Sequence, residues 1–533
     1  MVSNYLIWDI CSHWNYFRVY ACSQSSHTRP NCFIKKRITM KKILSLIILI
    51  SILFSAKYTE AQNKKVLSID QVIELAVDQA PRAIMARHTF RASYWSFKSY
   101  RSNYLPSLTL NSTPLDLNRS FESITLDDGS DGFVERSLFS SSGNLEITQR
   151  IAPTGGDLFV STSLERVELL TDEQITTYLI APVMVGYRQP LVTFNAYRWE
   201  RKIEPLRYKE AKREYLSSLE DISRMAISYF FDLSLAQINK EISESNFYNN
   251  DTLYKIAQGR YNMGTIAKDE LLQMELSFLT SRKAFNEADL NLRIARFNLQ
   301  SFLGITDDTE LSLIIPSDMP QFEINVDTAL QYAYDNNPQM IALERQKIEA
   351  DRDVAEARAN NLFNANLNAT IGLNKYSQNL TNTFNNLENS QMVSVGISIP
   401  ILDWGVGRGR YEMAKSQREL SLINIEQQQV DFDQQVFLEV AKFNMQDEQL
   451  LIAAKSDTIA KIRYDITKQR FKVGKVSILD LNVALQEKDV ARRDYISALR
   501  EFWQNYYRIR GYTLYDFINN EKLDVDFEQL IEN

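Results

Sequence analysis

The chain has 533 residues, of which 24% are charged and 44% are hydrophobic, and its formal net charge is −7. A net negative charge argues against a general nucleic-acid-binding protein, and three histidines leave little material for imidazole catalysis or a histidine-rich metal site. The length allows two or more ordinary domains or one large elongated domain.

Residues 40–61 have the layout of a secretory signal peptide. Lys41 and Lys42 form a positive start, Ile43–Phe54 is an apolar core, and a cleavage site precedes Gln62. The core has 12 residues, which is too short for a stable transmembrane helix. The alternative interpretation is a short N-terminal membrane anchor.

Residues 1–39 precede this signal peptide, and we interpret them as the product of a start codon placed too early. The expected mature chain, residues 62–533, has no cysteine and forms no disulfide. The first 61 residues hold eight basic and two acidic side chains, so the mature chain keeps 52 basic and 65 acidic ones and a net charge of −13. All three cysteines lie in the extension, at Cys11, Cys22 and Cys32.

The mature sequence contains a duplication. Three pairs of segments carry it in the same order: IDQVIELAVDQAP (Ile69–Pro81) with VDTALQYAYDNNP (Val326–Pro338), VGYRQPL (Val185–Leu191) with VGISIPI (Val395–Ile401), and RYNMGTIAKDELL (Arg260–Leu272) with RFKVGKVSILDLN (Arg470–Asn482). The first pair is offset by 257 positions and the other two by 210, so the first half carries 47 extra residues. We expect a first repeat over 62–315, a second over 316–511 and a C-terminal tail over 512–533.

Each repeat is expected to run from a helix through strands into a long helical hairpin. Leu206–Leu303 contains no proline and only two glycines, and Arg410–Arg510 contains one glycine. Because both residue types destabilise helix interiors, hairpins are predicted at about 196–304 and about 406–510. Apolar residues in the first hairpin follow a heptad typical of a coiled coil, interrupted only by Ser281: Leu271, Met274, Phe278, Phe285, Ala288, Leu292, Ala295, Leu299 and Phe302.

Strands are predicted at about 105–193 and about 365–403, where apolar residues alternate with polar or small ones. This alternation gives a strand one oily face and one wet face. It fits a soluble sandwich or a transmembrane barrel. Four clear strands are too few to close a barrel in one chain, so a barrel would have to be shared between subunits.

The chain resembles an outer-membrane efflux protein of the TolC family over about residues 65–515. The resemblance rests on the duplicated layout, on the two glycine motifs, and on the strand exits RQPLVTFNAYR (Arg188–Arg198) and IPILDWGVGRGR (Ile399–Arg410). It implies a mainly α fold with a β-barrel part, in which a homotrimer builds a long coiled-coil α-barrel and shares one transmembrane β-barrel. Each subunit would give four strands to a twelve-stranded barrel. The 47 extra residues depart from this pattern and leave open a second hairpin inside the membrane or outside it.

The same resemblance implies a passive exit duct in the outer membrane of a Gram-negative cell, extending into the periplasm. Such a porin-like channel serves a tripartite efflux or type I secretion system and passes small molecules or polypeptides. Its partners would be a periplasmic adaptor protein, an inner-membrane pump and outer-membrane lipid, with no cofactor, no nucleic acid and no enzymatic reaction. The alternative is a periplasmic coiled-coil scaffold protein with a small β-domain, which needs no continuous lipid-facing belt on its strands.

Candidate site residues follow from the resemblance. Pro190, Pro400 and Gly405 mark strand-to-helix turns. The hairpin tips would dock the adaptor, and a glycine in each tip permits the positive φ of a tight reversal. The alternative for the apolar tip residues is packing against the neighbouring hairpin. The tip residues are Met263, Gly264, Ile266, Val473, Gly474 and Val476.

The resemblance also assigns a periplasmic constriction. Asp480 occupies the position of an acidic ring that narrows the tunnel above the tip, and Glu270 is its equivalent in the first half. Three symmetry copies of a carboxylate would make a negative constriction. A second acid three residues further on is replaced by Val483. The alternative is that both carboxylates are solvated and favour the dipole of a first helical turn.

Overall fold

The computed structural model describes residues 64–532 except 126–128, 171–174, 307–309, 317–319, 321 and 474. Residues 66–533 form one compact unit. Residues 1–65 form a separate unit, of which Lys64 and Lys65 alone are described. The predicted extension over 1–39 and signal peptide over 40–61 therefore lie outside the described residues.

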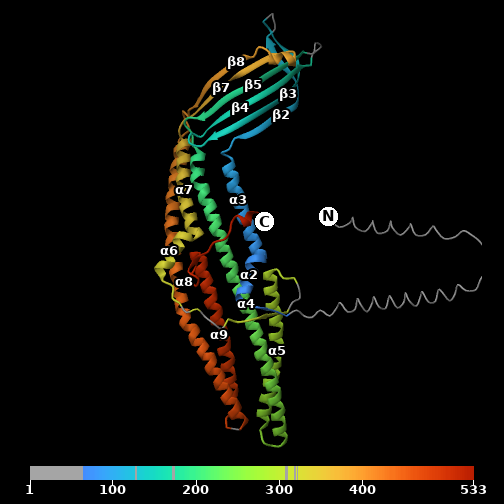
Figure 1. The fold of residues 1–533 in the computed structure, drawn as a ribbon, viewed down its shortest axis with the longest axis vertical. Helices are drawn as coiled ribbons and strands as arrows, with labels where there is room; N and C mark the ends of the chain where they lie inside the picture. Colours follow the sequence, from blue (N-terminus) through green and yellow to red (C-terminus); the bar gives the residue numbers. More distant parts are fainter. Residues whose placement is uncertain are drawn as a thin grey trace, which may run out of the picture. The chain divides into compact units, whose positions relative to one another are not determined.

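The long helices of the two halves have matching lengths (Figure 1). In the order of the chain, each half has a short helix, a medium helix and two long helices, and the long ones have 67 and 36 residues in both halves. A helix of 67 residues is about 100 Å long. The helices are α2 (Ile69–Gln79), α3 (Pro81–Ser102), α4 (Ala196–Asn262) and α5 (Lys268–Leu303), then α6 (Val326–Asn336), α7 (Pro338–Asn360), α8 (Val406–Lys472) and α9 (Ile478–Thr513), with α10 (Gln529–Glu532) near the end.

The helix starts follow from local sequence. Ser68 caps α2 in a capping box with Gln71, and Asn325 caps α6 by accepting from Thr328 N at 3.1 Å. Pro81 and Pro338 are the first residues of α3 and α7, where a proline loses no helical hydrogen bond. The two repeats therefore begin with the same arrangement of a capped short helix followed by a helix that starts with proline.

The heptad predicted in the first hairpin is the packed side of α5. Met274, Ala288, Leu292 and Leu299 are buried. The interruption, Ser281, is buried too, and its hydroxyl donates to Phe278 O at 2.8 Å. A polar residue is therefore accommodated in the seam without an unsatisfied hydroxyl group.

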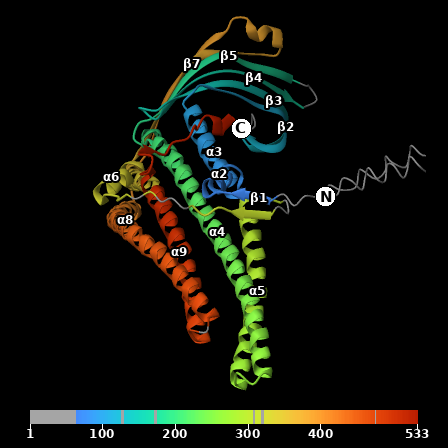
Figure 2. The ribbon, with the colours of Figure 1, turned by 60° about the horizontal axis from the view of Figure 1, so that its bottom comes forward.

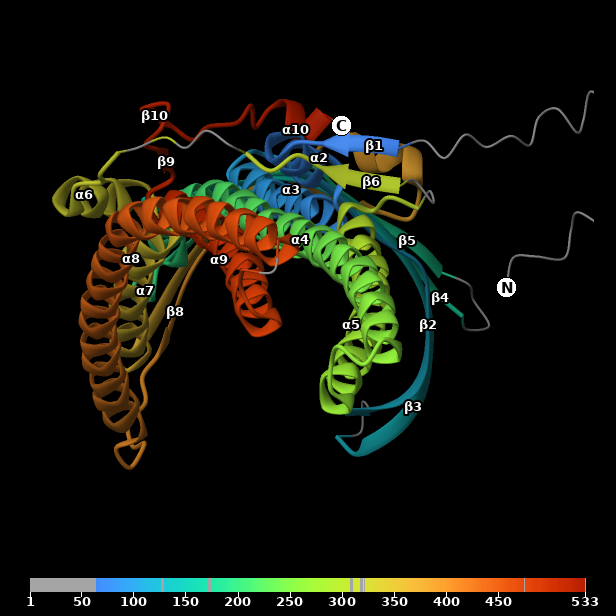
Figure 3. The ribbon, with the colours of Figure 1, turned by 90° about the horizontal axis from the view of Figure 1, so that it is seen from below.

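A single antiparallel sheet contains strands from both halves in the order β2-β3-β4-β5-β7-β8. The expectation of four strands per subunit is corrected here, because the sheet has six. The hairpin of β3 and β4 accounts for the 47 extra residues and is inserted between β2 and β5, the counterparts of β7 and β8. The strands are β2 (Ser107–Thr125), β3 (Asp131–Ile151), β4 (Gly156–Leu169), β5 (Ile175–Pro190), β7 (Asn364–Ser377) and β8 (Glu388–Ser398), and Figure 3 shows that the sheet is curved.

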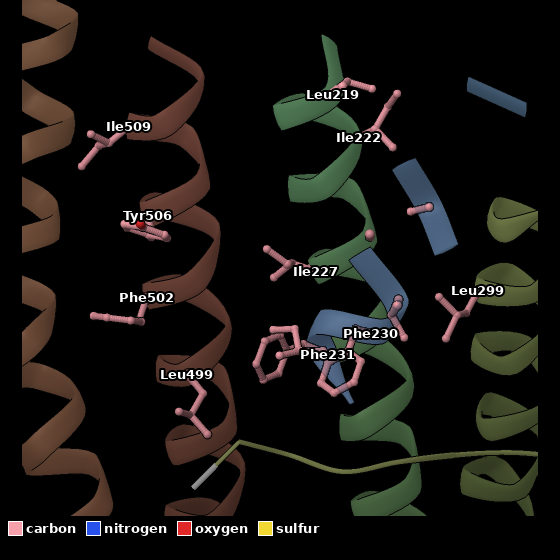
Figure 4. Close-up of a cluster of buried hydrophobic side chains, with 14 of the residues drawn as sticks. Leu219, Ile222, Ile227, Phe230, Phe231, Leu299, Leu499, Phe502, Tyr506 and Ile509 are labelled. Carbon is pink, nitrogen blue, oxygen red and sulfur yellow. The ribbon is translucent and has the colours of Figure 1, made fainter. Parts of the chain in front are cut away.

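The hydrophobic core lies between the long helices. Phe230 and Phe231 of α4 are fully buried, as are Leu499, Phe502 and Tyr506 of α9 (Figure 4). Full burial of a side chain of this size stabilises a fold by about 1.5–3 kcal/mol. Each helical hairpin is thus fixed to the other at this level, and Figure 2 shows their tips as two separate ends.

The C-terminal segment packs against helices of both halves. α9 extends to Thr513, slightly beyond the predicted end of its hairpin at about 510. Phe527 packs against Phe90 of α3 with ring centroids 5.1 Å apart, and Arg91 Nε donates to Leu530 O at 2.6 Å. Between the end of α9 and Phe527, the chain forms the short strands β9 (Tyr515–Asp516) and β10 (Glu521–Lys522). Within the described part of the chain, no helix combines the length and the apolar character that crossing a membrane requires.

Candidate membrane-facing sheet and hairpin tips

One face of the sheet is apolar across its strands. The register places Leu108, Ile147, Val160, Val185 and Ile371 directly opposite one another from β2 to β7. Side chains two residues apart on a strand share a face, so further apolar residues belong to it. We call this set the apolar face, and it also contains Leu110, Leu145, Leu158, Val183, Leu367, Leu373, Val393, Val395 and Ile397.

The apolar face is uncovered in the single chain. Val185, in the middle of the sheet, is 36% exposed, and Val393 on the edge strand is 73% exposed. An apolar surface that crosses a whole sheet is far larger than the scattered apolar residues on an ordinary soluble surface. Lipid or another protein must therefore cover this face.

The opposite face is polar. Arg188 Nη2 and Glu146 Oε1 form an ion pair of 2.9 Å across it, and Thr148 Oγ1 donates to the same carboxylate at 2.8 Å. The guanidinium of Arg188 also lies 4.4 Å from the ring centre of Phe159. Further polar members are Thr109, Asn111, Asn144, Asn366, Asn368 and Thr370. The sheet thus separates a wet side from an oily side.

The candidate turn residues lie at the end of β5, just after β8 and at the start of α8. Pro190 is the last residue of β5, and Pro400 follows β8 after one residue. Gly405, at φ +88°, is the N-cap of α8. The carboxylate of Asp403 accepts hydrogen bonds from Gly407 N at 2.8 Å and Gly405 N at 2.9 Å. These hydrogen bonds lower the pKa of the Asp403 carboxyl and fix the first turn of α8.

The tip between α4 and α5 is a compact reversal. Gly264 has φ +72°, and its N–H donates to Tyr261 O at 2.9 Å, while Thr265 N donates to Arg260 O at 3.0 Å. These two bonds are those of a Schellman motif, which needs a left-handed residue and favours glycine. Met263 is 72% exposed beside the glycine, and Ile266 is half-buried.

The second tip repeats the reversal. Lys475 N donates to Arg470 O at 2.9 Å, which corresponds to the bond from Thr265 to Arg260 in the first tip. Val473 is 67% exposed, and Val476 is half-buried. Gly474 lies outside the described residues. The docking role of both tips remains a prediction.

The two candidate constriction carboxylates have different surroundings. Asp480 caps its own helix, because its carboxylate accepts from Ser477 Oγ at 2.7 Å and Ser477 N at 3.1 Å, and its N–H donates back to Ser477 Oγ at 3.2 Å. The hydrogen bonds from Ser477 lower the pKa of the Asp480 carboxyl. Asp480 therefore has the structural role offered as the alternative, and a pore role in an assembly remains a prediction.

Glu270 lines a cavity between the two hairpins. The cavity has a volume of about 350 Å³, and Arg260, Ile266 and Lys468 also line it. Asp480 is not part of its lining. Within one chain the structure therefore does not bring Asp480 and Glu270 into one site.

A buried ionic cluster was missed by the sequence analysis. Arg510 Nη2 donates to Glu220 Oε1 and Arg510 Nη1 to Asp516 Oδ2, both at 3.0 Å. Burial raises the pKa of Glu220 to about 7, although Arg510 acts in the opposite direction. The signal was available, since Glu220 lies four residues after Leu216 and seven before Ile227, both buried, on the core side of α4.

Part of the sequence matches a known protein family, and the fold resembles solved structures. Residues 329–513 match the family described as "Outer membrane efflux protein". The fold resembles that of the CmeC outer membrane channel of Campylobacter jejuni, with 15% identity, a TM-score of 0.63, and coverage of 87% of this chain and 88% of that one. It also resembles the outer membrane protein VceC of Vibrio cholerae, with 12% identity, a TM-score of 0.57, and coverage of 86% and 97%. No curated protein matches the sequence.

Proposed function

We propose that this chain is a passive outer-membrane channel, because residues 329–513 match the family described as "Outer membrane efflux protein". Three copies would form one duct from the periplasm through the outer membrane. The duct would serve a tripartite efflux or type I secretion system and would carry out no chemical reaction itself. Its cargo would be small molecules or polypeptides.

The apolar face is the observation that supports this function over the alternative. A transmembrane sheet needs one face that lipid can cover and another that water can wet. The apolar face crosses every strand of the sheet, and polar side chains occupy the other side. A periplasmic scaffold gains nothing from such a belt, because in water the belt would promote aggregation.

The partners are proposed from the hairpin tips. Both tips end in exposed apolar residues, Met263 and Val473, next to a tight reversal. Small apolar side chains at the end of a helical hairpin can insert between the helices of another protein. We therefore place a periplasmic adaptor at the tips and an inner-membrane pump behind it as the source of energy.

Single-channel conductance tests the proposal. The mature chain, residues 62–533, would be purified from outer membranes as a heat-modifiable trimer and added to a planar lipid bilayer. Discrete conductance steps are the expected result. A soluble elongated particle that never inserts would instead favour the scaffold alternative.

A further inference from the structure

The sheet has two edges, β2 and β8, and each has one strand neighbour in the described chain. In the proposed lipid setting such an edge is unfavourable, because each unpaired N–H or C=O group in hydrocarbon costs several kcal/mol. A strand of another molecule must therefore pair with each edge.

The strand directions allow the two edges to pair with each other between copies. Five successive antiparallel pairings lead from β2 to β8, so these two strands run in opposite directions. Both strands also meet helices at the same end of the sheet, since β2 follows α3 and β8 leads into α8. Ser107 of β2 and Ser398 of β8 are the strand residues at that end.

The register shows how far the strands are staggered. Starting at Ser107, the residues directly opposite one another are Thr148, Phe159, Gly186, Thr370 and finally Met392. Met392 lies six residues before Ser398, the end of β8. Suppose that Ser107 of a second copy pairs with Ser398 of the first. The strand register then shifts by six residues from one copy to the next.

This advance gives the tilt of a closed barrel. Six residues rise about 20 Å, and six strand spacings are about 29 Å wide, so the strands tilt by roughly 35°. Closed transmembrane barrels have tilts of about 35–45°. The stagger within one chain is therefore already that of a barrel.

The same alignment continues the apolar face across the junction. With Ser107 opposite Ser398, Leu108 is opposite Ile397 and Leu110 is opposite Val395. All four residues belong to the apolar face. A shift by one residue would place apolar side chains against the polar face.

We propose that β8 pairs with β2 of a second copy, with Ser398 opposite Ser107, and that three copies close an 18-stranded barrel. The number of three copies rests on the proposed function, and the six strands per copy come from the sheet order. Eighteen strands at this spacing and tilt enclose a backbone diameter of about 34 Å. A barrel with this many strands leaves an aqueous channel along its axis.

Cysteine cross-linking tests the pairing, because residues 62–533 contain no cysteine. Two double variants place cysteines across the junction: Leu110→Cys with Val395→Cys, and Asn111→Cys with Ser394→Cys. Adjacent positions alternate between wide and narrow pairs in an antiparallel ladder, so one of the two variants has the short Cα separation that suits a disulfide. Mild oxidation of outer membranes should link most chains into covalent dimers and trimers that a reductant separates.

The matched control is Leu110→Cys with Ile371→Cys, which keeps both residues on the apolar face but moves one away from the edge. Less than a tenth of its chains should become linked. Equal linking in the control, or links only within single chains, would overturn the pairing. Preferred linking of Leu110→Cys with Val393→Cys would overturn the stated register, because it shifts β8 by two residues.

Electron cryo-microscopy of the unmodified trimer in lipid nanodiscs provides an independent count of strands. Eighteen strands in cross-section would support the inference even if a cysteine variant failed to assemble. A conducting trimer with twelve strands would overturn the inference and leave the proposed function intact. A chain that neither trimerises nor inserts would overturn both.

Discussion

The guanidinium of Arg510 donates a 3.0 Å hydrogen bond to the carboxylate of Glu220, 290 residues earlier in the chain. The same guanidinium contacts Asp516 in the segment after α9. One buried side chain thus fixes the C-terminal segment and α9 to the first long helix. Since Glu220 is only 7% exposed, its ionisation is coupled to the stability of this junction.

Stability should fall as pH rises because of Glu220. The pKa of this carboxyl is raised by burial from 4.5 to about 7 in the folded chain. A raised pKa means that the folded state binds the proton more tightly, so this contribution is complete below pH 4.5 and is lost as pH rises through about 7. The full effect is on the order of 3 kcal/mol.

Glu220→Gln should remove this pH dependence. The measurement is the thermal midpoint of unfolding for the native chain and the variant at pH 5 and pH 8. The native chain should lose more stability than the variant over that interval. Glu241→Gln, at an exposed carboxylate of the same helix, is the control and should follow the native chain. Parallel behaviour of native chain and Glu220→Gln would contradict the assignment.

Val160→Arg should prevent stable insertion. Val160 belongs to the apolar face of β4, and an arginine facing lipid costs up to about 2–4 kcal/mol, the value at the membrane midplane. The yield of heat-modifiable trimer in outer-membrane fractions should fall sharply. Ser161→Arg adds the same charge one residue later, on the polar face, and should leave the yield nearly unchanged. A similar loss for both variants would show that the face assignment is wrong.

Gly264→Ala should loosen the first hairpin tip. A Cβ at Gly264 meets no neighbouring atom, so the penalty comes only from the left-handed backbone at φ +72°. That penalty is about 1–2 kcal/mol, and amide exchange of the tip should accelerate about 5- to 30-fold. Gly259→Ala, also in open space but inside α4, should slow local exchange instead, because alanine favours helix. Unchanged exchange in Gly264→Ala would argue against the strained reversal.

Asp480→Asn separates a pore role from a capping role. If Asp480 lines the constriction, removing its charge should weaken the cation preference of single channels. Ser477→Ala removes the hydroxyl that shares the same cap but keeps the carboxylate, so cation preference should persist. Equal effects of the two variants on ion selectivity would assign Asp480 to the helix cap alone.

Much of the helical architecture could be predicted because its signals are local. The absence of proline, the heptad ending in Leu299 and the glycine of each tip depend on nearby residues, and the observed hairpin of α4 and α5 covers Ala196–Leu303 against a predicted range of about 196–304. The ionic cluster of Glu220 and Arg510 is different, since only the packing of distant helices brings the two together.

The number of strands was harder to predict for a physical reason. A strand with one wet face carries a weak apolar signal, and β2 also contains Pro114 at an irregularity between Thr113 and Asp116. Proline is tolerated there because the hydrogen-bond ladder with β3 is interrupted at this position. Sequence periodicity therefore identified β3, β5, β7 and β8 more readily than β2 or β4.

The long helices have equal lengths in the two halves, although the number of strands differs. The length of the helical hairpins and the width of the sheet are therefore independent of each other. α4 and α8 have 67 residues each, and α5 and α9 have 36 each, although the first half carries an additional strand hairpin. Inserting a β-hairpin changes the circumference of a sheet, whereas adding helical turns changes the reach of a rod. The width of the sheet can therefore change in such a fold while the reach of its helical hairpins stays the same.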